Sequence, residues 1–130
     1  MEDIFVARLM TSDLETVTPD TLVEDAARTM RENDIGSLVV VDEANALEGI
    51  LTTTDFVEIV MKSQPKAQTT VSRYMSTDVV TATAQETISD VAETMLEHGF
   101  HHMPVVEDEE VIGIITTTDL AAYLAHDDFE

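Results

Sequence analysis

The chain has 130 residues, of which 44% are hydrophobic, and this length suits one compact domain or two small fused lobes rather than independent large domains. Its 27 Asp and Glu residues against 6 Lys and Arg residues give a formal net charge of −21. Because so acidic a surface repels the phosphate backbone of nucleic acids, we do not expect nucleic acid as a direct partner. The acidic residues alternate with regularly spaced apolar residues, which predicts a folded chain.

The acidic excess also suggests the salt concentration in which the chain works. Repulsion between like charges destabilises a compact state in dilute salt, whereas at ~1 M ionic strength the screening length falls to ~3 Å. Lys62 and Lys66 are the only lysines, and such a surface resembles that of proteins from extreme halophiles that keep concentrated KCl in the cytoplasm. We therefore expect a halophilic protein of haloarchaeal origin. The alternative is an acidic protein from an ordinary cell.

The sequence predicts a cytoplasmic protein that does not insert into a membrane. No run approaches the ~18 apolar residues of a spanning helix, and residues 1–4 lack the basic flank and the apolar stretch of a signal peptide. The absence of Cys excludes disulfides, thiolate nucleophiles and Cys-ligated zinc.

The sequence contains an internal repeat. A shift of 65 residues places residues 6–10 on residues 71–75, and residues 16–30 on residues 81–95. After a one-residue deletion near Ala46, Gly-Ile-Leu-Thr-Thr-Thr-Asp aligns with a later Gly-Ile-Ile-Thr-Thr-Thr-Asp, at residues 49–55 and 113–119. We therefore predict two copies of one motif, residues 1–64 and residues 65–130.

The same order of elements is expected in each copy. A short extended piece comes first, and a helix follows whose apolar residues recur at three- and four-residue spacing. Two apolar runs separated by acidic turn residues then predict a hairpin, and a second helix closes the copy. In copy one the extended piece, the two runs and the closing helix are residues 15–18, 38–41, 47–51 and 55–61. In copy two they are residues 79–83, 103–106, 111–115 and 119–125, and polar residues 63–70 link the copies.

The first helix of each copy is expected to begin differently. Thr87 and Asp90 have the spacing of a capping box in copy two. The aligned residue in copy one is Leu22, which has no side-chain acceptor. Thr21 with Glu24 is the expected substitute, one residue earlier.

These elements predict an α+β (mixed α/β) fold made of two β-α-β-β-α motifs. Two amphipathic helices can cover one face of each small sheet, which leaves apolar sheet surface without a partner inside the copy. Because two copies can cover each other, we expect one pseudo-twofold unit, with ligand clefts where the halves meet.

This order of elements resembles the tandem CBS (cystathionine beta-synthase) domain pair, or Bateman module, over residues 4–126. The resemblance rests also on Met10-Thr11, on Met75-Ser76, on the Pro-Val-Val strand that begins at Pro104, and on the two glycine-to-aspartate segments. It implies a regulatory, non-enzymatic module that binds AMP, ADP, ATP, S-adenosylmethionine or a related ligand in clefts between the motifs. It also implies a homodimer that passes ligand occupancy to an effector protein, with no required cofactor. Some members of the family bind metal ions or have no known ligand.

The family's ligand segment runs from a glycine through Thr or Ser to an Asp three residues later, and both copies keep it. The carboxylate of Asp55 or Asp119 offers two oxygens to the vicinal hydroxyls of a ribose. Thr52 or Thr116 adds a hydroxyl, and the adjoining helix N-terminus adds N–H groups for a phosphate. The alternative is an ordinary capping box, because Thr-x-x-Asp at a helix start also binds its own N–H groups.

The resemblance places adenine against the first strand and the inner strands of the motif. The residues so implied are Val17, Thr18, Ala82 and Thr83, with Leu38, Val39, Met103 and Pro104 as walls. Each apolar one of these also suits an ordinary core position.

The copies differ just before the inner strand, where His101-His102 align with Gly36-Ser37. Imidazoles that can be protonated suit a phosphate, so we expect the site of Thr116 and Asp119 to prefer a phosphorylated ligand. We expect the site of Thr52 and Asp55 to bind a less charged ligand or none. His98, His101 and His102 are three and four residues apart, so their imidazoles could also converge on a metal ion. No Cys and no known metal-site spacing accompanies them, and Gly99 suits a helix C-cap. Phosphate-facing or exposed histidines are the favoured interpretation, and no metal site is expected.

Other classes of function are distinguished by what the clefts contain. An enzyme is not expected, since the chain has no Cys and no recognisable nucleophile elbow. A ligand-independent dimerisation or protein-interaction module would have the same fold with clefts filled by apolar side chains. A metal-sensing module, or the regulatory half of a transporter or enzyme on another chain, is a further alternative.

Overall fold

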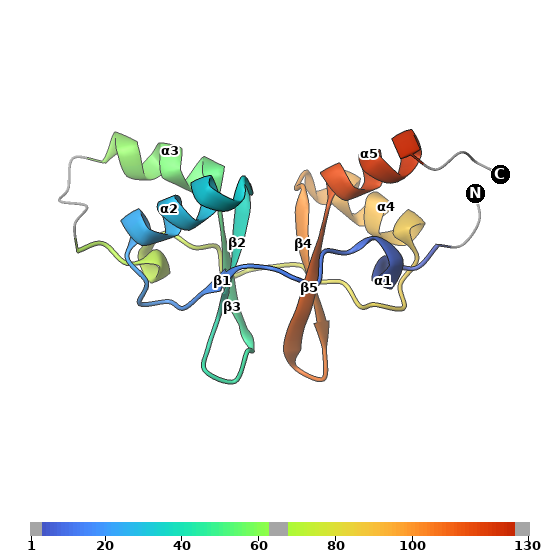
Figure 1. Ribbon diagram of the computed structural model, residues 1–130, viewed down its shortest axis with the longest axis horizontal. Helices are drawn as coiled ribbons and strands as arrows, with labels where there is room; N and C mark the ends of the chain where they lie inside the picture. The colour runs from blue at the N-terminus through green and yellow to red at the C-terminus, as the bar shows by residue number, and fades with distance from the viewer. Residues whose placement is uncertain (1–3, 63–67, 127–130) are drawn as a thin grey trace. The chain divides into compact units, whose positions relative to one another are not determined.

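The computed structural model describes residues 4–62 and 68–126, and the chain forms two compact units (Figure 1). Unit 2 consists of residues 15–79, and unit 1 consists of residues 1–14 together with residues 80–130. Both units are mixed α/β, which confirms the expected fold class. Of the predicted linker, residues 63–67 lie outside the described part of the chain.

Unit 2 is built on a three-stranded sheet with the order β1-β2-β3. Its elements are β1 (Thr16–Val17), α2 (Val23–Asn33), β2 (Ser37–Val41), β3 (Leu47–Thr52), α3 (Thr53–Met61) and a short 3-10 helix (Val71–Arg73). Strand β1 is parallel to β2, and β2 is antiparallel to β3. Helices α2 and α3 lie on one face of this sheet (Figure 1). The β-α-β-β-α order expected for copy one is therefore present.

Unit 1 contains a two-stranded antiparallel sheet with its helices on one face (Figure 1). Its elements are α1 (Val6–Leu9), α4 (Ile88–His98), β4 (His102–Glu107), β5 (Glu110–Thr116) and α5 (Thr117–His126). The extended piece expected at residues 79–83 forms only a single bridge, from Ala82 to Val105. Its aligned counterpart β1 pairs at two positions, Thr16 with Val39 and Val17 with Val40. Pro104 occupies the position of Val39, and its missing N–H removes a donor for the second pair.

The segments that begin the copies pack in an order that the repeat did not predict. Ser76 exchanges two backbone hydrogen bonds with Ile50, of 2.9 and 3.0 Å, so residues 69–76 complete the unit that holds copy one. Thr11 exchanges two with Ile114, of 2.8 and 3.0 Å, so residues 4–11 complete the unit that holds copy two. We call residues 4–11 and 69–76 the leading segments. The compact units thus differ from the repeats at 1–64 and 65–130, because each copy packs against the leading segment of the other.

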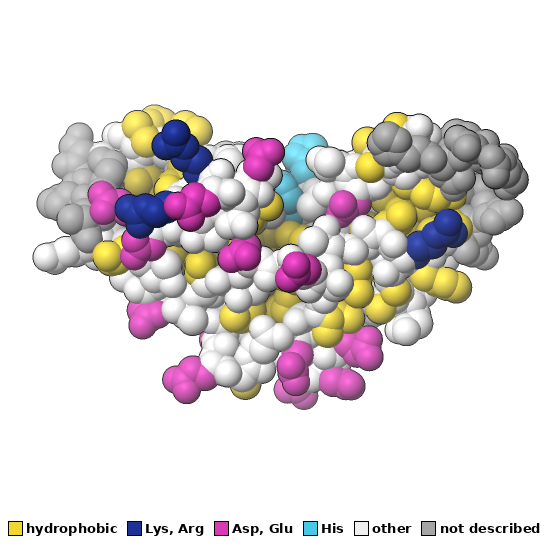
Figure 2. Space-filling model, viewed as in Figure 1, with side chains coloured by type: hydrophobic (Ala, Val, Ile, Leu, Met, Phe, Trp, Pro, Cys, Tyr) yellow, Lys and Arg dark blue, Asp and Glu magenta, His cyan; other side chains and the backbone are white. Residues whose placement is uncertain are grey.

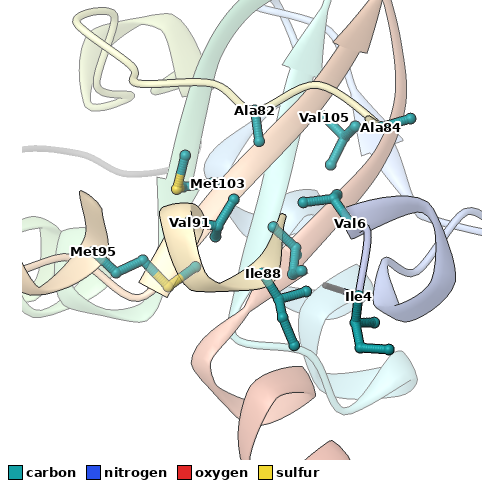
Figure 3. Packing of buried hydrophobic residues seen from close by; sticks show 10 residues of the cluster. Ile4, Val6, Ala82, Ala84, Ile88, Val91, Met95, Met103 and Val105 are labelled. Atoms are coloured by element: carbon teal, nitrogen blue, oxygen red, sulfur yellow. The ribbon is translucent and has the colours of Figure 1, made fainter. Parts of the chain in front are cut away.

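The core of unit 1 shows how firmly its leading segment is held. Val6 is fully buried together with Val91, Met103 and Val105 in one cluster of ten residues (Figure 3). In unit 2 the fully buried Val71 joins a second cluster. Each leading segment therefore contributes a buried core residue to its unit, in addition to its backbone hydrogen bonds with the hairpin.

The helix starts agree in part with the caps expected from the sequence. The hydroxyl of Thr87 accepts a hydrogen bond of 3.2 Å from the backbone N–H of Asp90. Helix α2 begins after Leu22 without a side-chain cap. The expected substitute at Thr21 is wrong, because its hydroxyl accepts from the backbone N–H of Thr18 instead, at 3.2 Å. None of the described helices has the length and apolar character needed to cross a bilayer.

Candidate functional site

The two Thr-x-x-Asp segments form capping boxes at the starts of α3 and α5. The backbone N–H of Thr52 donates to Oδ2 of Asp55 at 2.8 Å, and that of Thr116 donates to Oδ2 of Asp119 at 2.9 Å. In unit 1 the backbone N–H of Asp119 donates in turn to Oγ1 of Thr116 at 3.1 Å. The reciprocal bond is also present in unit 2. The capping role, considered as the alternative to ligand binding, is therefore observed in both copies.

Each capping Asp uses one of its two carboxylate oxygens. In both boxes the acceptor of the backbone N–H is Oδ2, and within the described residues Oδ1 has no hydrogen-bond partner. Both Asp55 and Asp119 are half-buried. The arrangement holds the carboxylate rigidly while it leaves one charged acceptor for a hydroxyl donor.

The first turns of α3 and α5 offer few N–H groups to a phosphate. The backbone N–H of Thr53 donates to the carbonyl of Gly36 at 3.2 Å, and that of Thr117 donates to the carbonyl of His101 at 3.0 Å. The N–H of each Asp is taken by its capping box. Among the described residues, Thr54 and Thr118 are left as the first-turn positions with an uncommitted N–H. A phosphate at either helix start would need further donors from side chains.

The glycines of the two segments serve the leading segments. A Cβ at Gly49 would lie 2.6 Å from the carbonyl oxygen of Ser76, and one at Gly113 would lie 2.8 Å from that of Thr11. Only glycine allows two backbones to approach this closely. Each of these two glycines is therefore needed for the fold of its unit. The sequence pattern alone does not distinguish this structural role from a role in contacting a ligand.

Three of the residues expected around adenine lie in the protein core. Leu38 is 0% exposed, and Met103 and Ala82 are each 1% exposed, and all three belong to the core clusters. Ala82 also uses both its N–H and its carbonyl, toward Pro104 and Val106, each at 2.9 Å. These side chains have no surface to offer a ligand in this conformation.

The other residues expected around adenine differ in burial. Val39 and Pro104 are buried, and Val17 is half-buried against the core of unit 2. Thr18 and Thr83 are exposed. The N–H of Thr83 donates to the carboxylate of Glu86 at 2.7 Å. Thr18 and Thr83 are thus the exposed residues of this set, and the hydroxyl of Thr18 already donates to the carboxylate of Asp20.

His102 lies beside the capping box of unit 1. It is paired with Thr116 across the β4–β5 hairpin and is half-buried. Burial lowers the pKa of His102 below its ordinary value of 6.5, the neighbouring His101 lowers it further, and Asp119 acts in the opposite direction. The net effect favours the neutral imidazole of His102 in the free protein. In unit 2 the corresponding neighbour of Thr52 is Ser37.

His98 contacts residues close to it in the sequence. Its ring stacks on Phe100 with centroids 5.3 Å apart, and its Nδ1 is 3.0 Å from the carbonyl oxygen of Thr94. Gly99, with φ of 74°, ends the helix in the left-handed conformation that the C-cap interpretation predicts. Within residues 4–62 and 68–126, no three His, Asp or Glu side chains come together in a way that could hold a metal ion.

Comparison with known proteins gives the same family for both copies. A model described as the CBS domain matches residues 6–62 and again residues 71–126. An uncharacterized 17.7 kDa protein of Acidianus ambivalens is 33% identical over 120 residues, which cover 92% of this chain and 72% of that protein.

Solved structures match this chain across both copies of the repeat. An uncharacterized conserved protein of Pyrococcus horikoshii has a TM-score of 0.89 at 30% identity, with 100% of this chain and 98% of that one covered. The CBS domain pair of protein MJ0100, in complex with 5′-methylthioadenosine and S-adenosyl-L-methionine, has a TM-score of 0.88 at 26% identity. That match covers 95% of this chain and 98% of the other.

Proposed function

This chain belongs to the CBS domain family, whose pairs are regulatory modules, and from this premise we propose that it senses an adenosine-containing ligand. The ligand binds at the Thr-x-x-Asp segments, with Asp55 or Asp119 accepting hydrogen bonds from the ribose. Binding stabilises one conformation of the module and so biases an effector protein outside the chain. The chain itself catalyses no reaction in this proposal.

The observation that carries the proposal is the half-used carboxylate in each capping box. Oδ2 of Asp55 and Oδ2 of Asp119 hold the helix starts, at 2.8 and 2.9 Å from the N–H of the preceding Thr, while Oδ1 remains available. A ribose hydroxyl is a donor that suits this acceptor. The ligands of the MJ0100 pair, both of which contain adenosine, support this ligand class.

The proposal is tested by calorimetric titration of AMP, ATP and S-adenosylmethionine in molar KCl. Asp55→Asn and Asp119→Asn keep an oxygen for the helix cap but remove the charged acceptor. We expect at least one of them to weaken binding by about tenfold or more, which corresponds to a charged hydrogen bond of about 1.5–3 kcal/mol.

Asp90→Asn is the matched control for these variants. Asp90 occupies the same position in the first turn of α4, behind the cap Thr87, and it is exposed. It should bind every ligand like the parent protein. If the folded protein gives no heat with any of the three ligands, the Thr-x-x-Asp segments act only as helix caps. That outcome would favour a ligand-independent interaction module.

We further propose that the site of unit 1 prefers a phosphorylated ligand because of His101 and His102. A phosphate next to His102 raises its pKa from the lowered value of the free protein. Binding therefore takes up a proton, and affinity for ATP should rise by about threefold to tenfold as the pH falls from about 8 to about 6. His102→Gln should remove this rise, whereas His98→Gln should keep it. If the affinity of His102→Gln for ATP rose equally as the pH fell, the rise would come from protonation of the ATP phosphates and not from His102.

The same pKa shift affects the free protein with a definite sign. Because the pKa of His102 is lower in the folded chain than its ordinary value of 6.5, protonation favours the unfolded chain. The contribution of His102 to stability is complete above that value and is lost as the pH falls below it. Acidification should therefore tighten ATP binding while it weakens the fold, and His102→Gln should remove both effects.

A further inference from the structure

The described methionines of this chain lie in three different environments. Because the chain has no Cys, no thiol competes with their thioethers for an oxidant. Three of them are buried in the cores, namely Met30, Met95 and Met103. Met61, at the end of α3, is 77% exposed. Met10 and Met75, which are aligned in the repeat, are half-buried and so remain within reach of a small oxidant in solution.

Met10 and Met75 each lie against the glycine of a hairpin. A Cβ at Gly113 would lie 2.9 Å from Sδ of Met10, and one at Gly49 would lie 3.0 Å from Sδ of Met75. Each Met side chain also packs against the core cluster of its unit. The residue that follows each Met makes the paired backbone hydrogen bonds with the hairpin. Each sulfur therefore lies at the point where its leading segment is attached.

We propose that Met10 and Met75 are sites of reversible sulfoxidation by hydroperoxides, and that oxidation loosens the leading segment to which each belongs. In this reaction the thioether sulfur attacks one peroxide oxygen, so an S–O bond forms as the O–O bond breaks. The sulfur loses two electrons, and the proton of the transferred oxygen passes to the departing oxygen, which leaves as water or an alcohol. Reduction by two thiols reverses the change and gives the thioether, a disulfide and water.

A sulfoxide does not suit the place that each of these sulfurs occupies. Its oxygen is polar, and burial of a polar group without a hydrogen-bond donor is unfavourable. If the side chain instead turns out into water, its contacts with the glycine and the core are lost. In either case the leading segment loses part of its attachment. In unit 1 the change also reaches the candidate site, because Thr11 pairs with Ile114 on β5, the strand that ends at Thr116.

Treatment of the folded protein with hydrogen peroxide in molar KCl, followed by peptide mass spectrometry, tests whether these sulfurs react. We expect Met61 to be oxidised first, Met10 and Met75 next, and the buried methionines last, because susceptibility follows exposure. Oxidation of Met10 and Met75 no faster than that of Met30 and Met95 would overturn the proposal.

Amide hydrogen exchange tests whether oxidation loosens the leading segments, and it needs no ligand. The N–H of Ile114 and that of Ile50 each donate to a carbonyl of a leading segment at 3.0 Å, so their exchange reports its attachment. Both should exchange about tenfold faster or more in the oxidised protein, and a methionine sulfoxide reductase with a dithiol should restore the original rates. Unchanged rates in protein that carries both sulfoxides would contradict the proposal.

Leucine variants are the matched controls, because leucine fills a similar volume and has no sulfur. In Met10→Leu, oxidation should still speed exchange at Ile50 but not at Ile114. In Met75→Leu the pattern should be reversed, and Met61→Leu should respond like the parent protein. Faster exchange of Ile114 in oxidised Met10→Leu would assign the effect to another residue and would also overturn the proposal.

Discussion

Replacement of Gly113 by alanine is expected to lower the free energy of unfolding by about 2–3 kcal/mol, the cost of forcing an added methyl into a packed site. The new Cβ would lie 2.8 Å from the carbonyl oxygen of Thr11 and 2.9 Å from Sδ of Met10. The sulfur can move, but the carbonyl cannot move without loss of the paired hydrogen bonds between Thr11 and Ile114. Urea unfolding in molar KCl measures the change.

Gly49→Ala should have an effect of the same size in unit 2, because its Cβ would lie 2.6 Å from the carbonyl oxygen of Ser76. Gly99→Ala is the control of the same chemistry. A Cβ at Gly99 meets nothing within 4 Å, and its cost of about 1 kcal/mol comes from the positive φ of 74° alone. Equal losses at all three glycines would mean that the leading segments do not approach the hairpins as described.

The elements of the fold followed from local sequence, whereas the pairing of the leading segments did not. Helix and strand periods are set by residues a few positions apart, which is why α2, α4 and both hairpins were predictable. The leading segments are themselves copies of each other, and Val6 and Val71 are aligned. Either segment therefore suits either hairpin by pattern, and the sequence held no signal for the exchange.

Pro104 explains why the strand predicted at residues 79–83 does not form. The piece at residues 79–83 has the same pattern as its counterpart β1, but its partner strand contains Pro104 where the other contains Val39. Parallel pairing needs the N–H that proline lacks.

The candidate site was predictable in its residues but not in its role. Thr-x-x-Asp is the pattern of both a capping box and a ligand segment, and the structure contains the capping box in both copies. Burial then separates the other candidates. Leu38, Met103 and Ala82 lie in core clusters, which no local pattern distinguishes from a pocket wall. His102 is placed next to Thr116 only by the hairpin register.

Stability should depend steeply on salt, because the negative charge has little local compensation. The chain has a formal net charge of −21, and magenta acidic side chains are spread over the face shown in Figure 2. Arg28 and Asp25 form an ion pair at 2.8 Å, with side chains 63% and 56% exposed. An exposed pair of this kind contributes little. The repulsion between the acidic side chains must therefore be reduced by dissolved salt, because the chain has few Lys and Arg residues to neutralise it.

We expect the melting temperature to rise by about 20 °C or more between about 0.05 M and about 2 M KCl, with partial unfolding at the lower concentration. Thermal unfolding followed by circular dichroism measures this rise. If screening is the cause, most of the gain should occur below about 1 M, where the screening length has already fallen to about 3 Å. A gain that continues undiminished above this concentration would instead indicate stronger burial of apolar surface. A melting temperature independent of KCl would contradict the halophilic interpretation.

A substitution at one position of the β4–β5 hairpin can test how much a local charge repulsion contributes to the salt dependence of stability. Glu107 and Glu110 face each other across the β4–β5 hairpin, and like charges directly opposite in a sheet are destabilising. Glu110→Lys should therefore stabilise the protein by about 0.5–1 kcal/mol in dilute salt and by much less in molar KCl. Glu110→Gln removes the repulsion without adding an attraction and should give a smaller gain. If the gain from lysine were the same at both salt concentrations, packing rather than charge would be its cause, and the acidic surface would not explain the salt dependence.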